Sequence, residues 1–480
     1  MIGAGAAARA AALAATTALL LLQGACSRPP EAHGTAIRDV TVIDAVNGVR
    51  EHQIVHYDGD RIVAVYDVGE ERPPAAEVID GRGGYLIPGL WDMHVHLTYD
   101  AALTPAMPAM FLYYGVTSVR DTGGLLEQLE PVVSRMRAPG ALAPRVFFSG
   151  PLLDGPLVVY DGVSRPHIGI AVPTAAAARD TVARLAAASV DFIKIYELVE
   201  PPVFEALVDA ARQLGLPIAA HVPLSMTAPR VAPEVDSLEH LRNIELACAA
   251  DAPALLDARR AIMAAYQPGS GYELRALLHG AQRLYAVGNY DAARCAVVLE
   301  ALRHTIQVPT LRLNAFALAP PFARDDWQDA LRLLPADRRA AWAAPSGERT
   351  AADTTFAEWS LKLTGDMNAR GIPVGAGTDT PIAFAIPGYS LHSELEMLVR
   401  AGLSPMQALA AATVQPAHFF GLDSRMGAIE AGRRADLVLL TADPLEDIAN
   451  TRRIDLVVAA GRTLPRAGLR EQLEAAINAQ

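Results

Sequence analysis

Two histidines that lie two residues apart are the side chains best suited by type and spacing to chemistry. His94 and His96 stand in the run Asp92-Met93-His94-Val95-His96-Leu97. Side chains at positions i and i+2 of a β-strand point to the same face, so a strand here would direct both imidazoles into one cavity. Neutral imidazole is a common ligand of divalent transition metals. The pair alone fits a metal site or two hydrogen-bonded histidines on a half-buried strand, and further ligands decide between these interpretations.

Metal-competent or ionisable side chains recur near the ends of four later apolar runs, each with the length of a buried strand. The C-terminal ends of parallel strands meet at one face of a barrel, where such folds place their chemistry. We therefore expect these groups to join His94 and His96 in one cavity. They are Lys194 in Asp191-Phe192-Ile193-Lys194-Ile195-Tyr196, His221 in Ala220-His221-Val222, His240 in Leu238-Glu239-His240 and Asp379 in Gly377-Thr378-Asp379.

Lys194 is informative because lysine is rare in this chain. Only two of the 41 lysines and arginines are lysines, Lys194 and Lys362. An unpaired ammonium between two isoleucines is costly to bury, and burial lowers the pKa of a lysine so that the neutral amine becomes accessible. A neutral amine takes up carbon dioxide as a carbamate, whose two oxygens can bridge two cations. The structural alternative is a lysine that pairs with a carboxylate such as Glu197 or Glu239.

Strand and helix patterns alternate between residues 86 and 425, which predicts an α/β protein whose main domain is a (β/α)8 barrel of the TIM type. We expect strands at 86–96, 116–121, 145–149, 191–196, 217–222, 237–241, 306–311 and 373–378. We expect helices at 104–114, 125–138, 174–189, 201–214, 291–304, 354–370 and 390–401, and a helix interrupted by prolines at 226–235. A doubly wound sheet is the alternative, but no Gly-rich phosphate loop opens any of these helices.

Segments outside this alternation complete the domain organisation. The stretches 242–290 and 312–352 are longer than ordinary connections and follow strands six and seven, so they would roof the C-terminal face of the barrel. Residues 36–85 and 426–465 alternate apolar and polar positions, and neither segment is long enough for a stable sheet by itself. Together they predict one small β-sandwich built from both ends of the chain, followed by a helix or tail at 466–480.

The first 26 residues have the composition of a secretory signal, with Arg9, an apolar run and small residues before Cys26. The apolar run is too short to span a bilayer. The stretch is similar to a bacterial lipoprotein signal that would lipidate Cys26, although Gln23 stands where an aliphatic residue is usual, and ordinary cleavage nearby is the alternative. Residues 27–35 read as a short extended tether. These features predict an exported protein in the periplasm or, as a lipoprotein, on the outer membrane.

Net charge and cysteine content limit the partners. The chain has a formal charge of −12 at pH 7 and no basic cluster, which argues against nucleic acid as a partner. Membrane contact is expected only through a lipid on Cys26, and homo-oligomer formation is left open. Cys248 and Cys295 could pair in an oxidising compartment, but two separate buried thiols are the expectation. Three cysteines also exclude a thiolate zinc cluster.

The motifs together resemble the amidohydrolase superfamily, specifically the branch of imidazolonepropionase-like enzymes and bacterial prolidase-like dipeptidases. The resemblance extends from about residue 36 to residue 465. Besides the runs quoted above, it rests on Pro88-Gly89-Leu90-Trp91, Val308-Pro309-Thr310-Leu311 and Gly427-Ala428-Ile429-Glu430-Ala431-Gly432-Arg433-Arg434-Ala435-Asp436-Leu437.

This resemblance implies a centre of two divalent metal ions, usually zinc, whose shared hydroxide attacks an amide carbonyl. Asp379 would accept the proton of the hydroxide and pass it to the leaving nitrogen. The implied ligands are His94, His96 and Asp379 for one ion, His221 and His240 for the other, and carboxylated Lys194 for both.

Other polar residues near the predicted barrel mouth have less certain roles. Tyr196 shares the strand face of Lys194; the resemblance suggests a hydrogen bond to substrate, and packing in the core is the alternative. His167 lies in a loop above the mouth, where it could contact substrate or stabilise an oxyanion. Arg120 and Asp121 end the second strand, where we expect a structural ion pair.

The leading hypothesis is an exported metal-dependent hydrolase that cleaves the carbon–nitrogen bond of small amides such as dipeptides or N-acyl amino acids. Hydrolysis of a lactone, a cyclic imide or a carbamate on the same barrel is the alternative, and deamination on a single ion is disfavoured by the presence of Lys194. A non-catalytic metal-binding lipoprotein is a third hypothesis, against which the complete ligand set argues.

Overall fold

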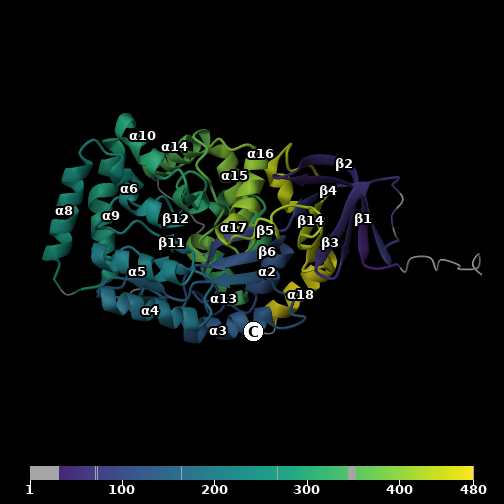
Figure 1. Ribbon diagram of the computed structural model, residues 1–480, viewed down its shortest axis with the longest axis horizontal. Coiled ribbons are helices and arrows are strands. Elements are labelled where there is room, and N and C mark those ends of the chain that lie inside the picture. Colours follow the sequence, from purple (N-terminus) through teal and green to yellow (C-terminus); the bar gives the residue numbers. More distant parts are fainter. Residues whose placement is uncertain are drawn as a thin grey trace, which may run out of the picture.

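The computed structural model describes residues 32–70, 72, 74–163, 165–267, 269–343 and 353–478. The predicted signal sequence with Cys26, and residues 27–31 of the predicted tether, lie outside these ranges. Within them, no helix combines the length and the apolar character needed to cross a membrane. A sheet lies at one end of the long axis of the molecule, and helices α8 (Ala252–Ala265) and α9 (Gly271–Gly288) lie at the other end (Figure 1).

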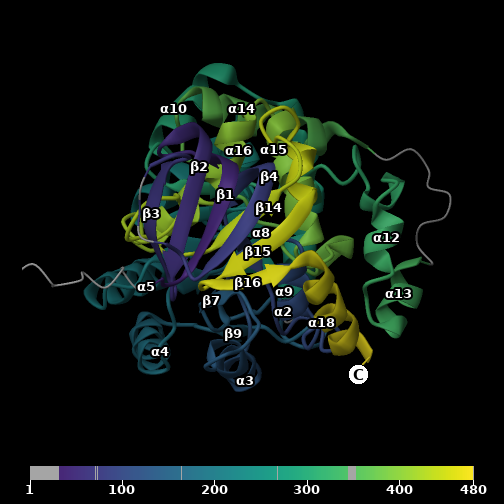
Figure 2. The ribbon, with the colours of Figure 1, turned by 90° about the vertical axis from the view of Figure 1, so that its right-hand side faces the viewer.

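The sheet at the end of the molecule is built from both ends of the chain. Its strand order is β16-β15-β14-β4-β1-β2-β3. The strands are β1 (Thr35–Asp44), β2 (Gly48–Asp58), β3 (Arg61–Asp67), β4 (Glu77–Pro88), β14 (Leu437–Leu440), β15 (Ile454–Ala459) and β16 (Arg462–Pro465). The two halves join where β4 pairs antiparallel with β14, with Leu86 opposite Leu439. Figure 2 shows the purple N-terminal strands and the yellow C-terminal strands side by side.

This sheet differs from the predicted sandwich because its seven strands form one hydrogen-bonded sheet and not two separate ones. The sheet folds over its own core, so that Ile37, Val55 and Leu437 belong to one buried cluster. At its open edge, the backbone N–H of Ile62 donates to the carbonyl of Arg433 at 2.8 Å. Curling of one twisted sheet thus buries the apolar face that the sequence pattern assigned to two sheets.

Parallel strands form two further sheets in the middle of the chain. The first contains β5 (Leu90–Val95), β6 (Val116–Asp121) and β7 (Arg145–Phe148). The second contains, in spatial order, β13 (Ile306–Val308), β12 (Ser237–Glu239), β11 (Ile218–Ala220), β10 (Ile193–Ile195), β8 (Leu152–Asp154) and β9 (Gly169–Ala171). Neighbouring strands in both sheets are parallel. The molecule is therefore an α/β protein with mixed and parallel sheets.

The strand predicted at 373–378 is replaced by a nearly extended segment with isolated bridges. Val374 bridges Gln307 of β13, and Thr380 bridges Val95 of β5. Glycine allows this segment to lie very close to β5, since a Cβ at Gly377 would stand 2.8 Å from the Cβ of His94. The segment therefore occupies the predicted place between β13 and β5 without forming a regular strand.

Helices lie on the chain where the sequence predicts them, with ends that differ by a few residues. They are α2 (Met107–Tyr113), α3 (Leu126–Arg137), α4 (Ala175–Ala187), α5 (Pro201–Gln213), α10 (Ala292–Ala301), α14 (Thr355–Ala369) and α15 (Tyr389–Arg400). At 226–235 the prolines leave only α6 (Ala228–Val231) and a 3-10 turn. The chain continues through α16 (Pro405–Ala411) and α17 (Val414–Phe419), and α18 (Arg466–Asn478) follows the sheet.

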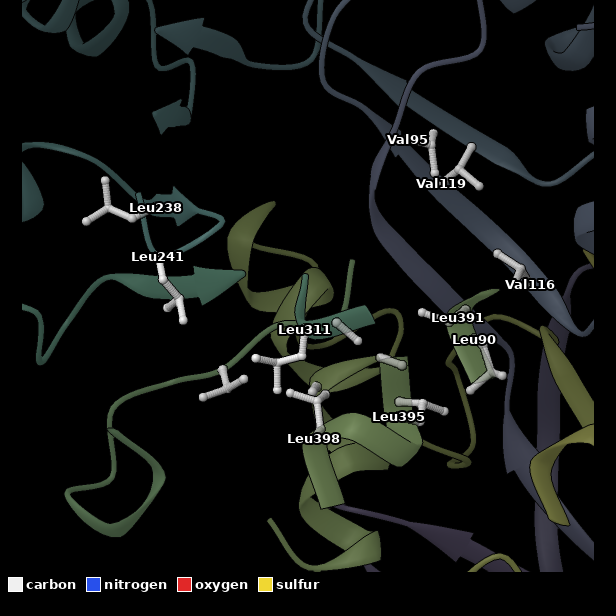
Figure 3. Packing of buried hydrophobic residues seen from close by; sticks show 14 of the residues in the cluster. Leu90, Val95, Val116, Val119, Leu238, Leu241, Leu311, Leu391, Leu395 and Leu398 are labelled. Carbon is white, nitrogen blue, oxygen red and sulfur yellow. The ribbon is translucent and has the colours of Figure 1, made fainter. Parts of the chain in front are cut away.

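Buried leucines and valines connect the helices to the parallel strands. Leu391, Leu395 and Leu398 recur at helical spacing on one face of α15 and are completely buried (Figure 3). They belong to the same cluster as Leu90 of β5 and Leu311. Full burial of one such side chain contributes about 1.5–3 kcal/mol. The rigid core thus fixes the strand ends on which the candidate site is built.

The two predicted insertions are helical. Residues 242–290 form α7 (Ile244–Ala247) and the hairpin of α8 and α9. A capping box at Ser270 and Glu273 fixes the start of α9. In the segment 312–352, residues up to 343 are described, and they continue α11 (Leu311–Asn314) and form a 3-10 turn at Pro321–Ala323, α12 (Trp327–Leu331) and α13 (Ala336–Ala343).

The expectation of two separate buried thiols is wrong, because Cys248 and Cys295 form a disulfide. Cys248 follows α7 directly, and Cys295 lies in the first turn of α10. The sequence could not reveal the pairing because 47 residues separate the two cysteines. The bond closes the base of the α8–α9 hairpin.

We expect the double substitution Cys248→Ser and Cys295→Ser to lower the free energy of unfolding by about 2–5 kcal/mol, the usual cost of losing a disulfide. Urea denaturation with and without dithiothreitol measures the effect. Reductant should destabilise the unsubstituted chain and leave the double variant unchanged. An unsubstituted chain that is indifferent to reductant would contradict the pairing.

Candidate metal centre

The six predicted ligands line one cavity of about 190 Å³, so the structure brings together every one of them. They lie at or just beyond the C-terminal ends of four strands and of the segment 373–380: His94 and His96 with β5, Lys194 in β10, His221 after β11, His240 after β12, and Asp379. All six side chains are buried. Residues separated by up to 285 positions in the sequence thus share one cavity.

His94, His96 and Asp379 form the tighter half of the cluster. An Oδ1 atom of Asp379 lies 3.2 Å from Nε2 of His96 and 3.4 Å from Nε2 of His94. One ligand atom from each of the three residues fits within 4.8 Å of the others. The backbone N–H of Asp379 donates to the carbonyl of His94 at 2.7 Å, which fixes the carboxylate against β5. Two imidazoles and a carboxylate at this spacing are suited to a divalent transition metal.

His221, His240 and Lys194 form the other half of the cluster. The ring centroid of His240 lies 4.4 Å from that of His94 and 4.8 Å from that of His221. Lys194 is completely buried, and its Nζ atom has no hydrogen-bond partner among the described residues. Burial lowers the pKa of Lys194 to about 8. Lys194 does not pair directly with Glu197 or Glu239, which was the structural alternative. A buried amine with no partner among the described residues is consistent with a group that completes the site.

Each histidine is oriented through Nδ1 by a neighbouring acceptor. The four pairs are His94 with Glu239 at 2.7 Å, His96 with the carbonyl of Gly123 at 3.0 Å, His221 with Glu197 at 2.7 Å, and His240 with the Thr310 hydroxyl at 2.6 Å. Carboxylate and carbonyl oxygens only accept, so Nδ1 donates to them. The Thr310 hydroxyl donates to the carbonyl of Pro309 and therefore accepts from His240. A neutral imidazole that donates through Nδ1 carries its lone pair on Nε2, which is the atom that can bind a metal ion.

Electrostatics keep two of these rings neutral. Burial lowers the pKa of His94 to about 4 and that of His221 to about 3. Burial opposes ionisation of Asp379, but His240, His96 and His94 outweigh it and hold the pKa of Asp379 well below its usual range. Neutral imidazole and ionised carboxylate are the forms that bind metal.

Glu239 connects the centre to the second strand. Its Oε1 accepts from Nη2 of Arg120 at 2.7 Å and from the hydroxyl of Ser237 at 2.7 Å. The ion pair expected between Arg120 and Asp121 is therefore wrong. Asp121 accepts instead from the backbone N–H groups of Leu97 and Gly123. Adjacent strand residues point to opposite faces, which is why Arg120 and Asp121 do not meet.

Glu197 connects the centre to the helical insertion. Besides His221, it contacts Nε of Arg275 at 3.0 Å and Nε2 of His279 at 3.1 Å. Arg275 and His279 lie one turn apart on α9, so both face the same carboxylate. Neither residue was identified from the sequence, because the path of the insertion was not predictable.

Tyr196 and His167 differ in their relation to the cavity. Tyr196 lines it, with its ring centroid 4.4 Å from that of His221, and its hydroxyl has a pKa raised by burial. His167 is exposed, bridges Asp161, and is absent from the residues that line the cavity. Arg165, two positions earlier in the same loop, lines it. Tyr272, which the sequence places in the insertion as a residue that could wall the pocket, also lines it, and the remaining polar lining that sequence reasoning missed is Tyr99, Tyr160, Arg242 and Arg275.

Residues 358–464 match the amidohydrolase family. An imidazolonepropionase of Shouchella clausii is 32% identical over 120 residues, which cover 22% of this chain and 26% of that protein. An adenine deaminase of Moorella thermoacetica is 24% identical over 437 residues, which cover 90% of this chain and 58% of that protein. The chain thus spans a quarter to somewhat more than half of the length of these two relatives.

Solved structures share the fold over nearly the whole chain. A Xaa-Pro dipeptidase with bound methionine has a TM-score of 0.65 at 18% identity, covering 90% of this chain and 99% of the other. A putative prolidase from Bifidobacterium longum has a TM-score of 0.61 at 25% identity, covering 93% and 100%. The sequence match and the shared fold confirm the relation to the amidohydrolase superfamily that the histidine, lysine and aspartate motifs predict.

Proposed function

We propose that this chain is an exported metal-dependent amidohydrolase that cleaves the amide bond of small substrates such as dipeptides or N-acyl amino acids. One observation carries the proposal: four histidines, an ionised aspartate and a buried lysine that has no hydrogen-bond partner among the described residues converge on one cavity. The match to the amidohydrolase family and the hydrolases of similar fold support the same activity.

The donor set fits two divalent ions, for which we propose zinc. The residues that would hold them are His94, His96 and Asp379 for one ion, His221 and His240 for the other, and a carboxylated Lys194 for both. Two observations fit a pair of bound ions: the imidazoles of His94 and His221 are oriented by carboxylates, and the amine of Lys194 has no hydrogen-bond partner among the described residues. When bound, such ions activate water and polarise the scissile carbonyl.

The side chains of the cavity supply the remaining steps. Asp379 is ionised and accepts a proton from the attacking water, then donates it to the leaving nitrogen. The amide C–N bond breaks, and the products are a carboxylate and an amine. The Tyr196 hydroxyl is protonated at neutral pH, as tyrosine ordinarily is, and burial raises its pKa further, so it can donate a hydrogen bond to the substrate.

The parallel strands are parts of one (β/α)8 barrel in this proposal. The N–H of Gly375 donates to the carbonyl of Gln307 at 2.8 Å, and that of Met93 donates to the carbonyl of Ala376 at 2.9 Å. On the other side, the N–H of Asp191 donates to the carbonyl of Phe148 at 2.9 Å. These bonds link the two parallel sheets at both sides, as closure requires.

Export is part of the proposal because two features agree with it. The predicted signal at residues 1–26, with lipid attachment at Cys26, would deliver the chain to the periplasm or to the outer membrane. The disulfide between Cys248 and Cys295 is the kind of bond that persists in oxidising compartments.

A second candidate activity follows from the relatives named adenine deaminase and imidazolonepropionase. It is attack at a ring carbon, which would release ammonia or open a cyclic amide. A single ion and a dispensable Lys194 would favour deamination, whereas two ions per chain favour amide hydrolysis. Metal content and the detection of ammonia separate the two.

We expect the zinc-loaded chain to hydrolyse members of a library of dipeptides and N-acyl amino acids, and a chelator to abolish this activity. Lys194→Ala should lower kcat/KM by about a hundredfold or more, since the metals contribute several kcal/mol. Lys362→Ala, at the chain's other lysine, is the matched control and should remain active. A fully active Lys194→Ala without added short carboxylates would contradict the bridging role.

Glu197→Gln should weaken binding of the ion held by His221 by about 10–100-fold, because the carboxylate that orients the imidazole is lost. Metal content after dialysis against graded chelator concentrations measures the effect. Glu205→Gln, which removes an exposed partner of Arg230, is the control and should retain both ions. Equal metal retention in the two variants would show that Glu197 does not support the site.

A further inference from the structure

A second cavity, of about 530 Å³, lies at the opposite ends of the parallel strands from the candidate metal centre. Thr117, Arg145 and Asp191 line it at or near the N-terminal ends of β6, β7 and β10. Its other wall is the turn between β15 and β16 of the sheet, which lies beside β7 (Figure 2). Among the described residues, none lines both this cavity and that of the metal centre. Its volume is within the range of about 300–1,000 Å³ that is typical of small-molecule sites.

Three of the charged side chains that line this second cavity have close partners in its walls. Arg137 donates to Asp191 at 2.7 Å and to the carbonyl of Val146 at 2.8 Å. Arg462 of β16 donates to the carbonyl of Gly140 at 2.7 Å and thereby joins the sheet to the loop that precedes β7. The two other charged side chains of the lining, an aspartate and an arginine, lack such partners.

The aspartate is Asp436, whose side chain is only 10% exposed. Its Oδ1 atom accepts from the backbone N–H of Ala460 at 2.6 Å. Its Oδ2 atom is buried and has no hydrogen-bond partner within the described part of the chain. The nearest cation is Arg434, whose Nε lies 3.7 Å from Oδ2, and Arg434 pairs more closely with Asp60 at 2.9 Å. One oxygen of a buried carboxylate is therefore left to accept from a ligand.

The arginine is Arg145, the first residue of β7, which is half-buried. Its Nε atom is buried without a hydrogen-bond partner among the residues that the structure describes. Burial lowers the pKa of Arg145, and Asp436 partly offsets this effect; in turn, burial raises the pKa of Asp436 and Arg145 acts to lower it. The two charges thus act on each other through space, although they form no ion pair within 4 Å in the described structure.

Two opposite charges that line one cavity without meeting are unfavourable in the free protein, because each is partly removed from water and incompletely paired. A ligand that carries both an ammonium and a carboxylate can pair with each of them. A guanidinium matches a carboxylate, and an ammonium can donate to the free oxygen of an aspartate. The rest of the wall suits an apolar side chain, since it includes Leu112, Met136, Leu142, Pro144, Val146 and Leu464.

We propose that this second cavity binds a small zwitterion with an apolar side chain, such as an apolar amino acid, between Arg145 and Asp436. The carboxylate of the ligand pairs with Arg145, and its ammonium donates to Oδ2 of Asp436. The inference goes beyond the proposed function, because the site is defined by charges that the metal centre does not use. Binding there requires neither metal ions nor hydrolysis.

Calorimetric titration of the zinc-loaded full chain with L-leucine tests the charge requirement. We expect saturable binding of L-leucine, and binding at least about tenfold weaker for 4-methylpentanoate, which lacks the ammonium, and for 3-methylbutylamine, which lacks the carboxylate. Either single-charge compound binding as tightly as L-leucine would overturn the zwitterion site. Absence of saturable binding of L-leucine at about 10 mM, beyond the weak end of specific affinities, would also overturn it.

Variants test the two residues. Asp436→Asn keeps the acceptor for the N–H of Ala460 but removes the charge, and it should weaken L-leucine binding about 10–100-fold, the cost of a charge-assisted hydrogen bond. Arg145→Gln should weaken it to a similar extent. Arg303→Gln, at an exposed arginine that pairs with Glu300, is the matched control and should bind normally. Undiminished binding to both Asp436→Asn and Arg145→Gln would overturn the site.

Two further measurements separate this site from the metal centre. Lys194→Ala changes the other cavity and should retain the L-leucine binding that Asp436→Asn loses. Hydrogen exchange of the backbone amides of residues 138–147 and 459–464, which line the second cavity, should slow when L-leucine is added. Binding that Lys194→Ala abolishes and Asp436→Asn retains would place L-leucine in the metal centre and overturn the inference.

Discussion

The candidate centre depends on the ion pairs and hydrogen bonds of two buried carboxylates, Glu197 and Glu239. Both are almost fully removed from solvent, and a buried charge is stable only when partners surround it. Glu239 is held by Arg120 and Ser237, and Glu197 is held by Arg275 and His279. Each carboxylate then fixes one histidine through Nδ1. The side chains of the centre are thus held in place by surrounding ion pairs whose members lie on different strands and helices.

Lys194 of β10 is not paired with either carboxylate, of which Glu197 follows β10 and Glu239 ends β12. The lysine is flanked by isoleucines in β10, a strand buried on all sides, and its amine points into the cavity that the histidines line. The carboxylates are already saturated by arginines and imidazoles, which explains why the lysine is left without a partner. A rare lysine kept in such surroundings is difficult to explain by packing and easy to explain by chemistry.

The sequence predicted well which side chains meet in one cavity, because they follow short apolar runs whose periodicity is local. Local sequence pattern was enough to identify His94 and His96 on one strand face and Lys194 between two isoleucines. The contacts that it could not predict are non-local: Arg275 and His279 reach Glu197 from a helix whose path depends on the whole insertion. The pairing of Cys248 with Cys295 was missed for the same reason. The segment predicted as a strand at 373–378 contains Gly375 and Gly377, which allow a close approach to β5 that replaces regular pairing.

The disulfide at the base of the α8–α9 hairpin has a consequence for how such a protein can change in evolution. The hairpin is a covalently closed unit that can vary in sequence while the parallel strands stay the same. Yet α9 both lines the cavity and supports Glu197, so the unit is not independent of the histidines below it. Exchange of the hairpin for another would alter the choice of substrate and the retention of metal in one step.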